Sequence, residues 1–183
     1  TLDGAPCRPA APIEGHGRFD PPTIPLDADG QGIPYATYGF AAQLCALAVD
    51  VKLGTVHLQR FVAAHDVGRA INPTLVEGQI HGGIQIGLGY ALYEDVAVDP
   101  GTGRLRGDSF ARYTLANAPE MPPVRTLLVE KVEPTGPFGA KAVGEIATVA
   151  VAPALVNAVN AALGTRLTDL PLLPERIILA MQN

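Results

Sequence analysis

The segment from residue 74 to about residue 95 combines the apolar spacing of a helix with an unusually high glycine content. Apolar residues stand at positions 75, 76, 80, 84, 88, 91 and 92, a spacing that predicts a helix. The same segment contains Gly78, Gly82, Gly83, Gly87 and Gly89. Each glycine costs roughly 1 kcal/mol relative to alanine in a helix interior. A chain keeps such a helix where another backbone or a ligand comes very close, so we expect tight packing, a ligand contact, or both.

Strand and helix signals surround this glycine-rich helix. Alternating apolar residues predict strands at residues 35–51, 55–62 and 124–132, and the first two are expected to form a β-hairpin. A second apolar helix is expected at residues 146–163, and residues 171–176 are expected to open a short last helix that runs through Met181. These elements predict an α+β fold.

Local signals indicate where the helices begin and end. Asn72 followed by Pro73 is typical of the start of a helix, and Gly164 is typical of the end of one. Pro153 lies inside the second apolar helix, which predicts a kink or a later start there.

Composition limits the classes of protein to which the chain can belong. Residues 1–34 are rich in proline and glycine and indicate an extended arm, so the domain is expected to occupy residues 35–183. Charged residues make up 17% of the chain, against about 25% in typical soluble domains, so we expect much of the surface to be buried against a partner. A net charge of −5 without a basic run excludes a nucleic-acid footprint. No apolar run of 18 residues is apparent, so no transmembrane segment is expected.

The cysteines and histidines show no metal-ligand spacing. Cys7 and Cys45 cannot supply the four thiolates of an Fe–S cluster. Cys45 lies in an apolar alternating segment and is expected to be an inert core thiol, with a Cys7–Cys45 disulfide as the less favoured alternative. No metal ligand is predicted, and a structural role is expected for each histidine: His16, His57, His65 and His81.

The turn at residues 136–145 runs directly into the second apolar helix and contains three glycines, one lysine and one carboxylate. Backbone N–H groups at such a turn form an anion site, and glycines let the main chain approach a ligand closely. Glu145 would then lie at the edge of that site. The alternative is structural, because glycine-rich turns before helices are common and the helix dipole alone favours a glutamate in the first turn.

Five stretches together resemble one family, the molybdenum hydroxylases of the xanthine dehydrogenase and aldehyde oxidoreductase group. The resemblance is to the C-terminal part of their molybdopterin-binding subunit, and it covers about residues 30–180. The stretches, which occur in the family's order, are residues 66–73 (DVGRAINP), 77–83 (EGQIHGG), 87–92 (GLGYAL), 136–145 (GPFGAKAVGE) and 167–176 (LTDLPLLPER).

The resemblance implies a mixed sheet with packed helices that forms the C-terminal half of a molybdopterin-binding domain. It implies oxidative hydroxylation of an aldehyde or an N-heterocycle with oxygen from water, with Glu145 as the catalytic base. The pterin phosphates would be bound by the loop around Gly139, Ala140, Lys141, Ala142, Val143 and Gly144. Lys141 would add positive charge there, unless it is a solvated loop lysine.

The glycine-rich helix would form a second wall of the cofactor site, through Gly82, Gly83 and Gln85. Many relatives carry a pterin-binding glutamine directly before Gly-Leu-Gly, where this chain has Ile86. Gln85 stands one residue earlier, which is a rotation of about 100° on a helix. Gln85 therefore cannot simply replace the missing glutamine.

The resemblance also implies partners. These are the remaining half of the molybdopterin-binding part, an Fe–S subunit, an FAD subunit and a small-molecule substrate. The cofactor would be molybdenum–molybdopterin, with the cytosine dinucleotide form left open, and 2Fe–2S clusters and FAD would lie on partner chains. The chain lacks a starting methionine and is expected to be a subunit or fragment that is not active alone. A cytoplasmic location is the default expectation, with co-export to the periplasm as the alternative.

Two other functions compete with this one. A non-catalytic assembly module with a vestigial molybdopterin-binding fold would have no reason to keep residues 141–145 (KAVGE) intact. The ordered family motifs argue against a small anion-binding protein built around the same loop.

Overall fold

The computed structural model describes residues 14–182 and divides into two units, the first ending at Ala36 and the second beginning at Thr37. In the first unit, Ile24 and Ile33 pair as an isolated antiparallel bridge, and Asp27 closes the turn between them by accepting a hydrogen bond from the Gln31 amide at 2.8 Å. The expected arm of residues 1–34 and domain of residues 35–183 stay predictions.

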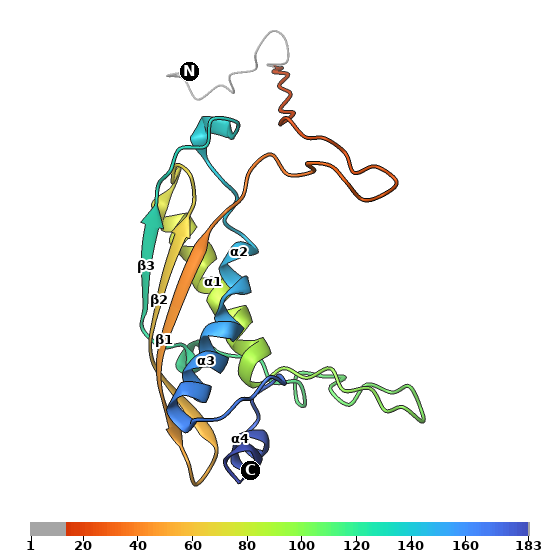
Figure 1. Ribbon diagram of the computed structural model, residues 1–183, viewed down its shortest axis with the longest axis vertical. Coiled ribbons are helices and arrows are strands. Elements are labelled where there is room, and N and C mark those ends of the chain that lie inside the picture. The colour runs from red at the N-terminus through yellow and green to blue at the C-terminus, as the bar shows by residue number, and fades with distance from the viewer. Residues whose placement is uncertain (1–13, 183) are drawn as a thin grey trace, which may run out of the picture. The chain divides into compact units, whose positions relative to one another are not determined.

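The second unit contains a three-stranded mixed sheet (Figure 1). Strands β1 (Ala41–Asp50) and β2 (Thr55–Asp66) form an antiparallel hairpin, with a register irregularity between Ala46 and Leu47. Strand β3 (Val124–Val129) pairs in parallel with the second half of β2. The predicted hairpin and third strand are confirmed, although β1 begins six residues later than the expected strand at residue 35 and β2 continues to Asp66.

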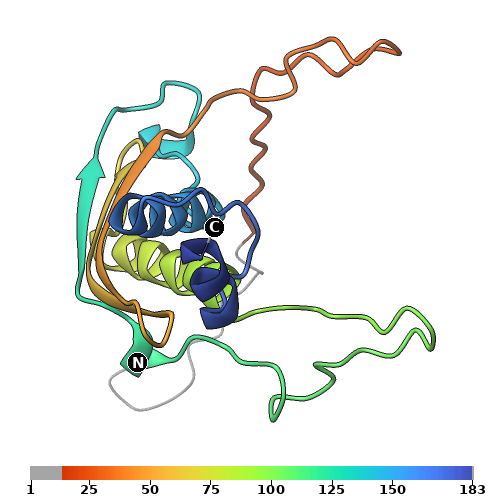
Figure 2. The ribbon, with the colours of Figure 1, turned by 60° about the horizontal axis from the view of Figure 1, so that its bottom comes forward.

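Helices cover one face of this sheet (Figures 1 and 2). Helix α1 (Pro73–Leu92) is the predicted glycine-rich helix, and beside it lie α2 (Ile146–Val149) and α3 (Val151–Leu163). Helix α4 (Pro174–Met181) ends the domain, and two short 3-10 helices occur at Ala118–Glu120 and Pro137–Gly139. The core lies between sheet and helices and includes Phe61, Ile80, Ile84, Leu88, Val151, Leu155, Val159 and Ile177, all fully or almost fully buried.

The predicted helix ends are confirmed. The Asn72 side chain accepts a hydrogen bond from the Leu75 amide at 3.2 Å, with Pro73 as the first residue of α1. Gly164 ends α3 in the left-handed conformation, with φ of 68°. The second apolar helix breaks at Ala150, so Pro153 falls in the first turn of α3, where a missing amide hydrogen is tolerated.

One stretch of the described residues, Ile146–Leu163, has the length and composition of a membrane-spanning helix, with a mean hydropathy of 1.8 over 18 residues. The expectation that no such apolar run exists is therefore wrong. In the structure this stretch is interrupted at Ala150, and α3 packs Val151, Leu155 and Val159 into the core.

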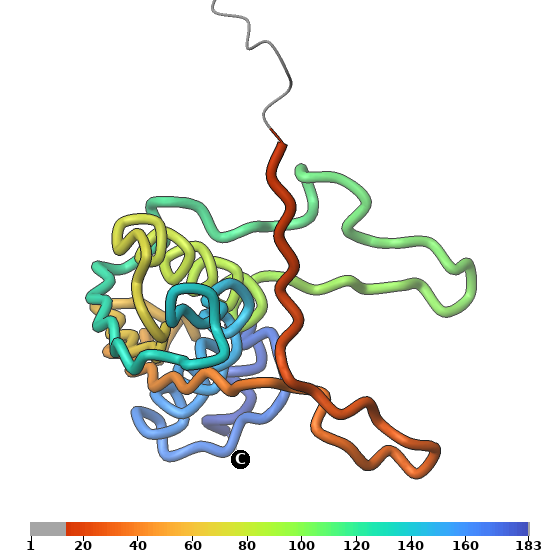
Figure 3. The backbone as a smooth tube through the Cα atoms, turned by 90° about the horizontal axis from the view of Figure 1, so that it is seen from above, coloured from red at the N-terminus to blue at the C-terminus, as the bar shows by residue number. Residues whose placement is uncertain are grey.

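A long excursion separates α1 from β3. Figure 3 shows residues 94–117, in green, leaving the helical layer and returning to it. Val98 and Leu105 pair within this arm, and the Gln85 side chain donates a 2.6 Å hydrogen bond to the Ala116 carbonyl where the arm returns.

Cys45 is a free, half-buried thiol on β1, and burial raises its pKa to about 11. Cys45 packs against the core, as expected, and its inertness stays a prediction. Cys7 lies outside the described residues, so the disulfide alternative has no structural test.

Candidate functional site

The turn at residues 136–145 lies at one end of the sheet, beside the turn that follows β2. The Arg69 amide donates to the Gly139 carbonyl at 2.8 Å, and the Lys141 amide donates to the Val67 carbonyl at 2.9 Å. Gly68 lies between these two bonds with φ of 62°, and a Cβ there would collide with the Gly139 carbonyl oxygen. The first half of the turn is therefore fastened to the end of β2.

Three of the predicted phosphate donors are consumed by the fold. The Gly139 amide donates to Gly136 and the Ala140 amide to Pro137, both at 3.0 Å, while the Lys141 amide is bound to Val67. These three amides already have acceptors within the protein, and the cofactor role expected for Gly139, Ala140 and Lys141 stays a prediction.

The second half of the turn is different. Within residues 14–182, the amides of Ala142, Val143, Gly144 and Glu145 donate to no protein acceptor. A Cβ built on Gly144 would meet nothing within 4 Å. Four successive donors thus precede α2 beside open space.

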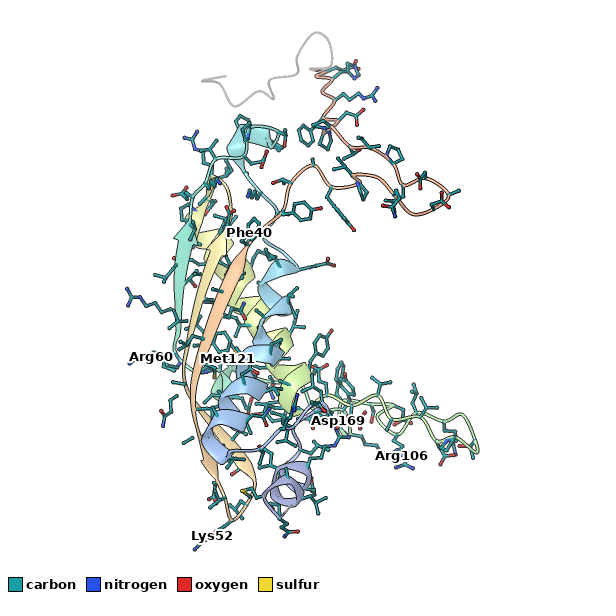
Figure 4. All side chains as sticks on the ribbon, viewed as in Figure 1. Phe40, Lys52, Arg60, Arg106, Met121 and Asp169 are labelled. Atoms are coloured by element: carbon teal, nitrogen blue, oxygen red, sulfur yellow. The ribbon has the colours of Figure 1, made fainter. Side chains whose placement is uncertain are left out.

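Lys141 is neither a solvated lysine nor a free cation. Its Nζ lies 2.7 Å from Asp66 Oδ2 and donates to the Tyr38 carbonyl at 2.9 Å. The side chains of Lys141 and Asp66 are only 8% and 9% exposed, and the Phe40 ring centre lies 6.0 Å from the ammonium nitrogen. The hydrogen bond from Lys141 lowers the pKa of the Asp66 carboxyl, against the opposing effect of burial. Figure 4 places Phe40 at the α2 end of β1, far from Lys52 in the hairpin turn.

Glu145 carries the last of the unpaired amides and precedes α2. Glu145 is exposed, its backbone is helical (φ −69°, ψ −29°), and its carboxylate makes no cap hydrogen bond. Among the described residues no other polar group is bound to it, so the carboxylate is available to a ligand on the outer side.

Ala147, two residues after Glu145, is bound to the sheet by a hydrogen bond. Ala147 is fully buried, and its carbonyl accepts a 2.8 Å hydrogen bond from Gln43 Nε2 on β1. The same nitrogen lies 3.2 Å from His65 Nε2. Because an amide nitrogen only donates, the His65 Nε2 must accept, and burial lowers the pKa of this histidine, which favours its neutral form. The structural role expected for His65 is confirmed.

The glycines of α1 divide into two groups. A Cβ on Gly83 would lie 2.5 Å from the Cβ of Ala147, and one on Gly87 would collide with Val151. A Cβ on Gly78 or Gly82 would meet nothing within 4 Å. Gly83 and Gly87 therefore allow α1 to pack against α2 and α3, whereas Gly82 leaves space on the outer side.

Gln85 and Ile86 take different sides of α1. The amide nitrogen of Gln85 is bound to the Ala116 carbonyl, which gives this side chain a structural use. Ile86 is 44% exposed and lies one turn after Gly82 on the same side of the helix. The cofactor contact expected for Gln85 stays a prediction.

Sequence reasoning missed two residues of this region. Gln43 gave no signal, because it is one polar residue in an alternating strand. Asp66 belongs to the family-like stretch of residues 66–73, but its bond to Lys141 joins residues 75 positions apart.

Comparison with known proteins matches this architecture. The family model for the molybdopterin cofactor-binding domain matches residues 7–122, which include α1 and end before residues 136–145. The xanthine dehydrogenase molybdenum-binding subunit of Escherichia coli O157:H7 is 37% identical over 138 residues, which are 75% of this chain and 18% of that protein. The carbon monoxide dehydrogenase large chain of Afipia carboxidovorans is 38% identical over 148 residues, 81% of this chain and 17% of that protein.

A solved structure extends the match to the fold. The aldehyde oxidoreductase from Desulfovibrio desulfuricans superposes with a TM-score of 0.80 and 34% identity, covering 87% of this chain and 17% of that one. The predicted fold class, α+β with a mixed sheet and packed helices, is confirmed. The chain spans less than a fifth of the length of these three proteins.

Proposed function

The chain belongs to the molybdopterin cofactor-binding domain family, as a member of the molybdenum hydroxylases, and we propose that it supplies the base Glu145 and one wall of the molybdopterin site of such an enzyme. The proposed reaction replaces a C–H bond of an aldehyde or an N-heterocycle by C–OH. Water supplies the oxygen, and two electrons and two protons are released. The observation that carries the proposal is the exposed, unpaired carboxylate of Glu145, which carries the last of four successive unpaired amides.

The residues present fit an anionic cofactor. The amides of Ala142, Val143 and Gly144 are donors of the kind that bind phosphate oxygens, and Gly82 leaves open space on α1 next to the Gly83–Ala147 contact. We propose these four residues as the cofactor wall, with the pterin phosphates bound by amides and not by the Lys141 ammonium, which is paired with Asp66. When bound, the molybdenum cofactor supplies the two-electron redox chemistry.

Glu145 acts on a proton in this proposal. Its carboxylate accepts the proton that leaves the water-derived oxygen, and its exposed place before α2 leaves both oxygens free to do so. A general base contributes about 10²- to 10⁴-fold to such a step.

The rest of the enzyme lies on other chain segments. We propose that the remaining molybdopterin-binding half completes the cofactor site and most of the substrate pocket. An Fe–S subunit and an FAD subunit would take the electrons onward. The cytosine dinucleotide form of the pterin, the inactivity of this chain alone and the cytoplasmic location stay predictions.

The test is Glu145→Gln in the assembled enzyme, purified with its partners. We expect turnover to fall at least about 10²-fold, while molybdenum and pterin content stay at the wild-type level. Glu175→Gln is the matched control, because Glu175 is also an exposed glutamate at a helix start, in the first turn of α4. Full turnover in Glu145→Gln would contradict the catalytic role and revive the non-catalytic module.

A further inference from the structure

We propose that Gln43, Asp66 and Lys141 are positioning residues that hold Glu145 from both sides. The inference rests on the proposed role of Glu145 as the base, and it adds the groups that fix its place. None of the three touches the carboxylate of Glu145, so each would act through the main chain.

The first anchor precedes Glu145. Lys141 lies four residues before it, and its ammonium group is bonded both to Asp66 Oδ2 and to the Tyr38 carbonyl. Asp66 is itself fixed, because its other oxygen accepts from the Gly68 amide at 3.2 Å. The last residue of β2 is thus tied to the point where the paired part of the loop ends.

The second anchor follows Glu145. Gln43 on β1 donates to the carbonyl of Ala147, and the Ala147 methyl packs onto Gly83 of α1. The Ile146 side chain packs onto Gly39, because a Cβ on Gly39 would lie 2.5 Å from Cδ1 of Ile146. The main chain and methyl group of Ala147 and the side chain of Ile146 are therefore fixed immediately after Glu145.

Between these anchors the main-chain amides are unpaired within the described part of the chain, and the half-buried side chain of Val143 packs against the core. Residues 142–145 make no main-chain hydrogen bond through their amides to any described residue, and Glu145 has no side-chain partner there. The position of a base on such a segment therefore depends on the two anchors and on the packing of Val143. Displacement of a catalytic group by about 1 Å can cost on the order of 10²-fold in rate.

A competing explanation assigns Lys141 directly to the cofactor phosphates. The two explanations predict opposite effects of removing Asp66. A phosphate-binding lysine would be freed by Asp66→Asn and cofactor content would hold or rise, whereas a positioning lysine would lose its anchor and the rate would fall.

The experiment compares Lys141→Met, Asp66→Asn, their double variant and Gln43→Leu in the assembled enzyme. We would measure kcat per bound molybdenum, KM, pterin content, and hydrogen exchange of the α2 amides at residues 146–149. Arg112→Met is the matched control, because Arg112 forms an exposed 3.4 Å ion pair with Asp108 on the arm.

We expect each single variant to lower kcat per molybdenum by about 10- to 100-fold, with KM near the wild-type value and faster exchange at residues 146–149. The double variant should regain stability, because no unpaired charge remains buried, yet its kcat should stay low because the tether is still absent. Arg112→Met should match the wild type.

Three results would overturn the inference. They are a full kcat in the double variant, unchanged exchange at residues 146–149 in every variant, or loss of pterin in Lys141→Met but not in Asp66→Asn. Wild-type enzyme without molybdenum or turnover would instead refute the proposed function, and the exchange measurement would still decide whether the anchors hold the segment.

Discussion

Replacing the adjacent glycines Gly82 and Gly83 by alanine separates their two roles. Both lie inside α1, so each substitution gains about 1 kcal/mol of helix propensity. At Gly83 the new Cβ would lie 2.5 Å from the Cβ and 3.0 Å from the carbonyl carbon of Ala147, so one helix must shift. Overpacking of this kind costs about 1–3 kcal/mol.

The propensity gain is common to both variants, so their difference isolates the overpacking. We expect Gly83→Ala to have a free energy of unfolding about 1–3 kcal/mol lower than that of Gly82→Ala. The measurement is urea unfolding of the purified chain, followed by circular dichroism. Equal stabilities would show that α1 and α2 adapt to the extra methyl group without cost, and would refute the close-packing argument.

The same two variants make a second comparison in the assembled enzyme. Gly82 faces open space in this chain, so its alanine variant is expected to lose molybdopterin while keeping its stability. Normal pterin content in Gly82→Ala would remove Gly82 from the proposed cofactor wall.

Three further predictions follow from individual contacts. Lys141 lowers the pKa of Asp66, so the stability that this pair contributes is complete above the ordinary aspartate pKa of about 3.9. That stability is lost as the pH falls through the lower pKa of the folded state. Asp66→Asn should remove this part of the acid unfolding curve. With its pKa raised to about 11, Cys45 should resist iodoacetamide at pH 8 in a Cys7→Ser background and react fully in urea, and rapid labelling of the folded chain would contradict the burial. Gln85→Ala removes the bond to Ala116, so trypsin should cleave the arm at Arg106 or Arg112 faster, at a cost of about 1 kcal/mol in stability, whereas an unchanged cleavage rate would show that the bond does not hold the arm.

The elements that the sequence predicted well are those with local signals. Asn72–Pro73 marks the start of α1, where the Asn72 side chain accepts a hydrogen bond from the amide three residues later, and Gly164 ends α3 through its own φ angle. The hairpin of β1 and β2 joins neighbouring segments with a short turn. In each case the residues that decide the structure are close together in the sequence.

The features that were missed depend on residues far apart. Gln43 meets Ala147 across 104 positions, and Asp66 meets Lys141 across 75. Neither the residue types nor their spacing in the sequence predicts such a pair. The loop was also predicted as one anion site, whereas its pairing with the turn after β2 leaves donors only in the second half.

The same division explains why the glycine-rich helix was ambiguous. In the sequence Gly82 and Gly83 are equivalent, and only the position of Ala147 makes one of them a packing residue. The outer side of α1 then continues as an exposed apolar surface through Leu75, Ile86 and Tyr90, which are 67%, 44% and 51% exposed. A helix that is apolar on both sides is buried on both sides in a finished protein. The chain spans 17% to 18% of the length of its relatives. We therefore propose that the remaining molybdopterin-binding half lies against the outer side of α1, where Ile86 would face it and Gly82 would lie next to the cofactor.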